Sequence, residues 1–324
     1  PRYELLARRM RAARHRPFSV HILDGCEPVE FDTDSVAPDA ATTSLQLHLR
    51  VSPGRFADYY NAAQTIAGVQ VAVGANAPFL LGHQAWQETR VPLLEQLLDT
   101  RRLKDVRAGA PARVRLGDRW ITDPVELFDD IVRDFPPLLP TMEAEDPDAA
   151  LEAGRAPSLR ELRLHNGTVW RWNRPVYDVQ AGRTQLRIEN RVLPSGPTAV
   201  DMIANAAYYY GLLRAVVDSD TAPWDQIPFA VAERDLHAAA RDGLAAQLSW
   251  RGVDYRAGRL TREVWRPAAA AGLDVWGVDS EDRDRYLGVI DARVRCGRTA
   301  PPGRSRWCAV WRSAGSSASR RCTR

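Results

Sequence analysis

Arg187, Glu189 and Arg191 alternate along one short stretch of the chain, with Leu186 and Ile188 falling on the opposite side. This period of two, with one apolar face, predicts a β-strand that is buried on one side. A carboxylate between two guanidiniums is costly to bury without partners. A metal ion and an anionic phosphate together would satisfy both signs of charge, so we predict a site on this strand face.

Residues 43–51 predict a second strand of the same kind. Its leucines and Val51 would face a core, while Gln46, His48 and Arg50 would form the other face. The chain therefore contains two predicted strands that each carry a polar face.

Each of these charged side chains also has a purely structural interpretation. Glu189 could belong only to a ladder of salt bridges on a sheet face. A lone histidine on a strand, such as His48, is often a satisfied structural group. Arg174, in the segment WRWNRP, could pack on the neighbouring tryptophans through a cation–π contact. Arg50 could be a surface residue.

Helices are predicted on either side of these strands and would position them. Ser52 and Pro53 supply a capping residue and a favourable first position for a helix that runs to about residue 73. A long apolar helix is predicted over residues 198–218, just after the charged strand. Residues 228–292 predict three further helices.

The dipeptide Asn166-Gly167 is a strong signal for a two-residue β-hairpin. We therefore expect strands over residues 159–165 and 168–173. This hairpin would directly precede the segment that contains Arg174.

Composition restricts the class of protein. The chain has 324 residues, 45% hydrophobic and 26% charged, which is typical of a globular protein with one large domain or two ordinary ones. No apolar run is long enough to span a membrane, and no secretory signal pattern is present. The four cysteines show no disulfide framework or zinc-ligand spacing, so a cytoplasmic location is expected. The net charge of +3 is misleading because nine arginines and no acids follow residue 292. Residues 1–292 hold 35 basic and 41 acidic groups, a balance of −6, which argues against general affinity for nucleic acid.

Residues 294–324 do not share the pattern of residues 1–293. They are rich in Arg, Ser, Gly and Pro, and they show neither helical nor strand periodicity. They could be a disordered basic arm that binds nucleic acid. A shifted reading frame in a GC-rich gene would give the same composition, and this second interpretation is favoured.

Several longer motifs carry a resemblance. The stretch LRIENRVLPSGPTAVDMIANAAYYYGLL resembles the strand-to-helix signature of the glutamine synthetase-like fold. The ordered series TTSLQLHLRVSP, GVQVAVGANAPFLLG, RLHNGTVWRWNRPVYD and RIENRVLPSGPTAVD is similar to family 2 glutamate–cysteine ligases, especially the actinobacterial type. The similarity covers roughly residues 3 to 298 and then stops abruptly.

The resemblance implies an α+β fold in which helices cover the outer face of a curved antiparallel sheet and the concave polar face forms the site. It also implies an ATP-dependent carboxylate–amine ligase that joins the γ-carboxylate of glutamate to the amine of cysteine through a γ-glutamyl phosphate. The implied cofactors are ATP and Mg²⁺, and no membrane or nucleic-acid partner is implied. The implied site residues are Glu189 and His48 for the metal, Arg191 and Arg174 for catalysis, and Arg187, His48 and Arg50 for the nucleotide.

Two departures from the family pattern affect these expectations. The family usually has two alternating histidines on its first strand, and here the positions hold Gln46 and His48. The family's opening strand with a pair of glutamates that hold metal is absent, so we expect an incomplete domain that alone is inactive or nearly so. Other interpretations stay open: a different acceptor amine, a catalytically inactive structural or regulatory module, and a homo-oligomer.

Overall fold

The computed structural model describes residues 2–140 and 145–297, and the basic tail from residue 298 onward lies outside them. The described residues form a mixed fold of helices and small antiparallel sheets, which confirms the predicted α+β class. Among them, no helix combines the length and apolarity that crossing a bilayer requires. The last helix, α13 (Ser280–Cys296), continues three residues beyond the predicted end of the domain at residue 293.

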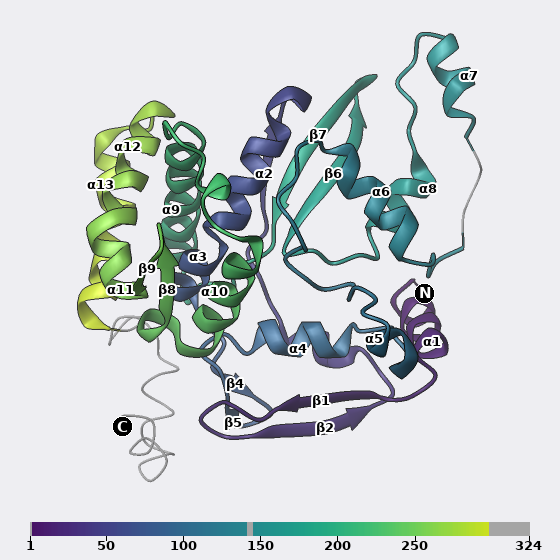
Figure 1. Cartoon of the computed structure of the whole chain (residues 1–324), viewed down its shortest axis with the longest axis horizontal. Helices are drawn as coiled ribbons and strands as arrows, with labels where there is room; N and C mark the ends of the chain where they lie inside the picture. The colour runs from purple at the N-terminus through teal and green to yellow at the C-terminus, as the bar shows by residue number, and fades with distance from the viewer. Residues whose placement is uncertain (1, 141–144, 298–324) are drawn as a thin grey trace.

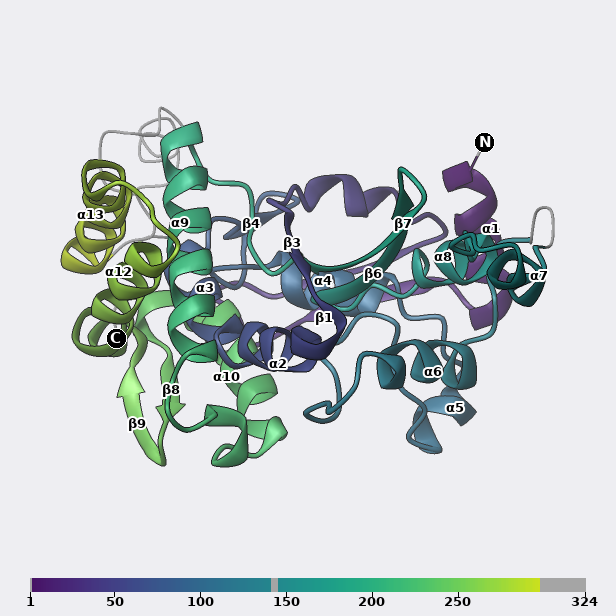
Figure 2. The same cartoon turned by 90° about the horizontal axis from the view of Figure 1, so that it is seen from above.

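A three-stranded antiparallel sheet lies at the centre of the molecule. Its strands are β3 (Leu47–Val51), β7 (Arg183–Asn190) and β6 (Asn173–Gln180), hydrogen-bonded in that order. Strands β6 and β7 form a long hairpin that curves across the middle of the molecule (Figure 2). The hairpin turns at Ala181 and Gly182, both with positive φ, as the tightest two-residue turns require.

Helix α2 (Phe56–Thr65) covers the apolar face of this sheet. Its Tyr60 hydroxyl donates to the carbonyl oxygen of Asn173 at 3.0 Å, and its Gln64 accepts from the Asn173 side chain at 2.7 Å. Ile188, in the middle of β7, is fully buried on this side. The alternation of β7 therefore leaves its charged side chains on the opposite face.

A layer of helices lies beside the sheet and holds α2 in place (Figure 1). Its central helix is α9 (Ala199–Val217), which begins where the Thr198 side chain caps the backbone N–H of Asp201. Helix α12 (Arg266–Val275) packs closely on α9, because Gly211 and Gly272 let the two backbones approach each other.

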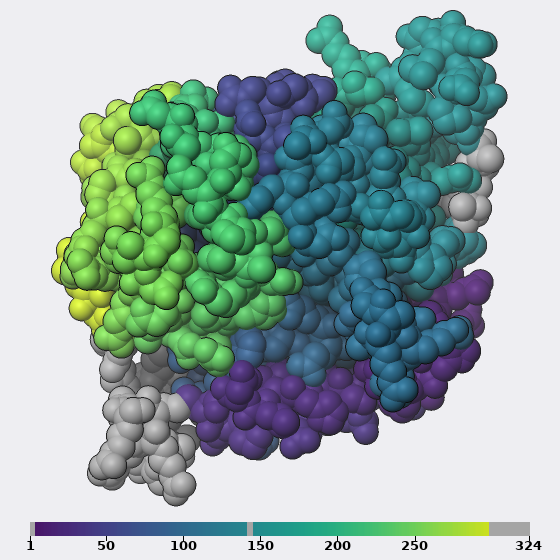
Figure 3. All heavy atoms as spheres, in the orientation of Figure 1, coloured from purple at the N-terminus to yellow at the C-terminus, as the bar shows by residue number. Residues whose placement is uncertain are grey.

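A second group of elements lies below the sheet in Figure 1. It comprises α1 (Arg2–Arg14), the hairpin of β1 (Phe18–Ile22) and β2 (Val29–Thr33), and α4 (Arg90–Leu97). The remaining longer helices and strands are α3 (Ala67–Gly74), α6 (Val125–Asp134), α7 (Pro147–Glu152), α8 (Arg160–Asn166), α10 (Phe229–Asp242), β8 (Gln247–Trp250) and β9 (Val253–Arg256). Figure 3 shows that the segment with α7 projects from the main body.

The prediction of a β-hairpin at Asn166-Gly167 is wrong. Residues 160–166 form helix α8, and Gly167 ends it. The Asn166 side chain is buried and donates to the carbonyl oxygen of Pro175 at 2.7 Å. The Asn166 side chain is therefore held by a tertiary contact. This packing overrides the local preference of the Asn-Gly dipeptide for a hairpin turn.

Two other elements differ from the predicted ones. The helix expected to run to about residue 73 breaks at Ile66 into α2 and α3. At that point the Thr65 hydroxyl donates to the carbonyl oxygen of Asn61, a backbone contact that bends helices. Residues 228–292 contain the predicted helices, and they also contain the β8–β9 hairpin, which was not predicted.

Candidate functional site

The register of the central sheet brings three predicted site residues into one row. His48 on β3 lies opposite Glu189 on β7, and Arg174 on β6 lies opposite the same glutamate. Since directly opposed side chains share a face, these three groups project from the polar side of the sheet. The sequence analysis predicted His48 and Glu189 on two separate strands and Arg174 in the segment after a hairpin, and the fold brings the three together.

The carboxylate of Glu189 is the centre of this row. It is buried, with 3% of its side chain exposed, and its Oε2 accepts from Arg174 Nε at 2.5 Å. Its Oε1 lies 3.5 Å from Arg191 Nη1 and 3.8 Å from His48 Nε2. Both oxygens therefore face arginine nitrogens, and the carboxylate holds two guanidiniums in fixed positions.

The next row of the polar face holds Arg50 on β3 directly opposite Arg187 on β7. Arg187 Nη2 donates to Asp178 at 3.0 Å, and the same carboxylate pairs with Arg163 at 2.8 Å. Arg50 is exposed. Like charges directly opposite each other destabilise a sheet unless an anion or a neighbouring acid compensates them. This row therefore adds to the positive potential of the face.

A cavity of about 520 Å³ opens at the end of the polar face, where Arg174 and Arg191 reach it. This volume is in the range of sites that hold small-molecule ligands. Helices α1 and α4 and the segment before β3 form the opposite walls. The cavity is lined by Leu6, Met10, Val36, Asp39, Ala40, Thr42, Thr43, Ser44, Gln46, Arg90, Leu94, Leu98, Val114, Gly167, Trp170, Trp172, Arg174 and Arg191.

Arg90 is a cavity residue that the sequence did not identify. It is buried in α4, pairs with Glu88 at 3.0 Å, and its guanidinium lies over the Trp172 ring at 5.3 Å. It also donates to the backbone carbonyl oxygens of Arg191 and Val192. Arg90 therefore fixes the chain directly after β7. Nothing in the local pattern indicated this role, because the two carbonyl groups that Arg90 holds lie about a hundred residues away in the sequence.

The turn at Asn76 also closes on this region. Asn76 donates its side-chain amide to the carbonyl oxygen of Ser195 at 3.0 Å, and its backbone N–H donates to Glu88 at 3.0 Å. The motifs that contain Gln46, Arg174 and Arg191 thus meet around one cavity although they lie far apart in the sequence. The motif that contains Asn76 contacts the neighbouring residues Ser195 and Glu88.

The electrostatic surroundings alter two of the site's titratable groups. Burial lowers the pKa of His48, and the nearby guanidiniums lower it further against the opposing effect of Glu189. His48 is therefore neutral at pH 7 and can accept a hydrogen bond. Burial also lowers the pKa of Arg191, although Glu189 opposes the shift. An incoming anion would relieve the cost of holding these cationic groups in a partly desolvated site.

The predicted metal ligands do not by themselves fit a resident divalent cation. Glu189 offers one carboxylate whose two oxygens already face arginines, and His48 adds one nitrogen. Within residues 2–140 and 145–297, no group of three or more His, Cys, Asp or Glu side chains could hold a metal ion. Mg²⁺ prefers several hard oxygen ligands, and the guanidiniums would repel it, so the geometry favours an anion.

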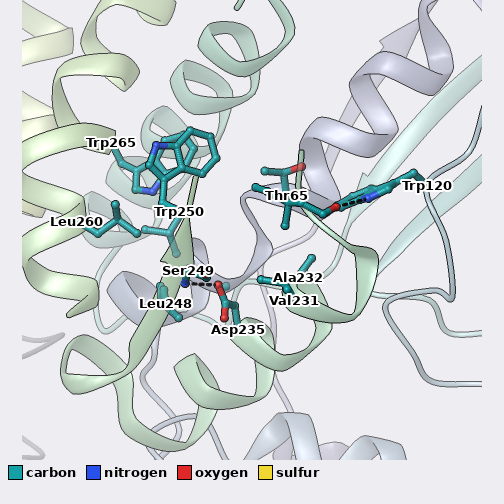
Figure 4. Close-up of a pocket in the computed structure, with 13 residues that line it drawn as sticks. Thr65, Trp120, Val231, Ala232, Asp235, Leu248, Ser249, Trp250, Leu260 and Trp265 are labelled. Atoms are coloured by element: carbon teal, nitrogen blue, oxygen red, sulfur yellow. Dashed lines mark hydrogen bonds between the residues drawn. The ribbon is translucent and has the colours of Figure 1, made fainter. Parts of the chain in front are cut away.

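A separate small cavity lies between α2, α10 and the β8–β9 hairpin (Figure 4). It measures about 20 Å³, enough for roughly one water molecule. Burial raises the pKa of Asp235 there, and this carboxylate accepts from the backbone N–H of Ser249 at 2.7 Å. Trp120, Trp250 and Trp265 form much of its wall. Its size excludes a nucleotide or an amino acid, so the larger cavity beside Arg174 and Arg191 is the better candidate site.

Comparison with known proteins identifies the family of the chain. The family described as glutamate-cysteine ligase family 2 matches residues 1–302, which is most of the chain. The search of curated proteins found no match to the chain. The family match supports an enzyme of the ligase type with carboxylate–amine chemistry. The match covers both polar-faced strands, the turn at Asn76 and the helices around the cavity, and the chain is therefore a member of glutamate-cysteine ligase family 2.

Proposed function

We propose that the chain joins the γ-carboxylate of glutamate to the amine of cysteine at the expense of ATP. An oxygen of the γ-carboxylate attacks the γ-phosphorus of ATP, the bond from that phosphorus to the β-bridging oxygen breaks, and ADP leaves. The amine nitrogen then attacks the acyl carbon, inorganic phosphate leaves, and the extra proton of the amine passes to solvent. The product is γ-glutamylcysteine.

The observation that carries this proposal is the pair of guanidiniums, Arg174 and Arg191, at the edge of the 520 Å³ cavity. Phosphoryl transfer depends on positioning and on charge stabilisation more than on covalent help from the protein. Glu189 holds both guanidiniums in place, and they would stabilise the charge on the transferred phosphoryl group. Arg187 and Arg50 would extend the positive surface toward the remaining phosphates of the nucleotide.

Mg²⁺ would enter as part of the nucleotide substrate, where it neutralises phosphate oxygens. Because Glu189 is already paired with two guanidiniums, we do not propose Glu189 and His48 as ligands of this ion. We propose glutamate, cysteine and ATP as the substrates and Mg²⁺ as the metal that accompanies ATP. We also propose that the protein is cytoplasmic and forms a homo-oligomer. The acceptor amine could also be one other than cysteine, because no cavity residue identifies it.

A catalytically inactive module is the second candidate, and the occupied oxygens of Glu189 favour it. Calorimetric titration with ATP and with L-glutamate distinguishes the two, accompanied by detection of ADP and γ-glutamylcysteine. The ligase proposal predicts that both ligands bind and that Arg191→Gln loses most of the ATP affinity. Binding is the primary readout because it reports directly on whether the cavity holds the two ligands. A chain that binds neither ligand would contradict the proposal.

A further inference from the structure

A continuous set of contacts connects the surface of α10 with the wall of the large cavity. Glu95 on α4 accepts a hydrogen bond from the indole Nε1 of Trp172 at 3.2 Å. The two carboxylate oxygens of Glu95 also lie 3.0 and 3.2 Å from Nε2 of His237 on α10. One carboxylate therefore joins a cavity residue to a helix that does not reach the cavity.

Trp172 is the member of this set that faces the cavity. Its side chain is almost fully buried, and Arg90 lies over its ring. Its carbonyl oxygen accepts from the backbone N–H of Arg191 at 2.9 Å. A change in the orientation of the Trp172 indole would therefore move the cavity wall and the Arg90 guanidinium that packs on it, and this guanidinium donates to the backbone carbonyl oxygen of Arg191 at 3.2 Å.

The hydrogen bonds of His237 require a protonated imidazole. Its Nδ1 lies 2.9 Å from the carbonyl oxygen of Glu233, which can only accept, and its Nε2 faces the Glu95 carboxylate. Both nitrogens must therefore donate. The charged groups that act on His237 are Glu95 on α4 and Glu233 on its own helix. Its hydrogen bond to Glu95 is the main cause that raises the pKa of His237 to about 9.

We propose that Glu95 and His237 are positioning residues that fix the Trp172 indole, and through it Arg191, at the wall of the cavity. That this cavity binds glutamate and ATP rests on the function proposed above. The positioning itself depends only on the contacts, and it can be tested without a ligand.

The test is a ¹⁹F NMR titration of the whole chain labelled with 5-fluorotryptophan, with the Trp172 signal assigned by Trp172→Phe. We expect this signal to shift between pH 7.5 and 10 with a midpoint near the His237 pKa of about 9. The transition should disappear in His237→Gln. It should persist in His83→Gln, a matched control on an exposed histidine that pairs with Glu27.

Two substitutions of Glu95 separate hydrogen-bond geometry from charge. In Glu95→Gln the amide can still accept a hydrogen bond from Trp172 and can donate one to a neutral His237. The Trp172 signal at pH 7.5 should therefore keep its position. Its transition near pH 9 should disappear. Glu95→Leu removes both hydrogen bonds, so the signal should move. In the same variant, the affinity for L-glutamate should fall roughly tenfold through misplacement of the wall.

Several results would overturn the proposal. A Trp172 signal that does not titrate near pH 9, or that titrates equally in His237→Gln, would show that the pair does not act on the indole. So would an unchanged signal in Glu95→Leu. If the parent chain binds no L-glutamate, the proposed function fails, while the NMR titration still decides the positioning role. If Glu95→Leu does not fold, the titration of Glu95→Gln decides whether Glu95 and His237 position the indole.

Discussion

Replacing the central carboxylate by its amide, Glu189→Gln, tests how the polar face is held together. Glu189 neutralises Arg174 at 2.5 Å and Arg191 at 3.5 Å with only 3% of its side chain exposed. Removing one partner of a buried ion pair costs about 3–5 kcal/mol. The two arginine side chains are 19% and 20% exposed, so water can partly solvate them once they are unpaired. We therefore expect a loss of about 2–3 kcal/mol in the free energy of unfolding.

Urea unfolding with and without pyrophosphate measures both parts of this prediction. Pyrophosphate would supply the missing negative charge, and a ligand at 100 times its dissociation constant stabilises the folded state by about 2.7 kcal/mol. Glu189→Gln should therefore gain more stability from pyrophosphate than the parent chain does.

Glu263→Gln is the matched control, because Glu263 also pairs with two arginines, at 2.8 and 3.5 Å, but on the surface. We expect no measurable loss there. Equal unfolding midpoints for the parent and Glu189→Gln, or equal gains from pyrophosphate, would refute the reasoning.

Three further perturbations test the surrounding fold. Arg293→Met should lower the free energy of unfolding by about 3–5 kcal/mol in urea, since it leaves Asp201 buried and unpaired; a loss below 1 kcal/mol would contradict this. Gly272→Ala should cost about 3 kcal/mol or more, because its Cβ would overlap a carbonyl oxygen of α9, whereas Gly288→Ala has free space and should be neutral or slightly stabilising. The raised pKa of His237, about 9, means that its contribution to stability is fully present below pH 6.5 and is lost as the pH rises through 9. Urea unfolding at pH 6.5 and 9.5 should therefore show a smaller decrease for His237→Gln than for the parent chain.

The polar faces could be predicted because strand alternation is a local property. The period of two placed Glu189 and Arg187 on one face and Ile188 on the other, and the sheet confirms both assignments. Helix α9 was predicted equally well, because a long apolar pattern defines it locally.

The walls of the cavity could not be predicted in the same way. Arg90 became a site residue only when α4 packed beneath the sheet and met Trp172 and the backbone at Arg191. Asn166 carried a strong local turn signal, yet its buried hydrogen bond to Pro175 placed it at the end of a helix. Both outcomes depend on contacts between residues distant in sequence or on tertiary packing, which a local pattern does not encode.

A crystal structure of the chain with ADP and L-glutamate tests the central claim most directly. We expect nucleotide phosphate oxygens about 3 Å from the guanidiniums of Arg174 and Arg191, with the amino acid in the adjoining 520 Å³ cavity. Nucleotide bound elsewhere on the molecule, with both guanidiniums still paired only with Glu189, would contradict it.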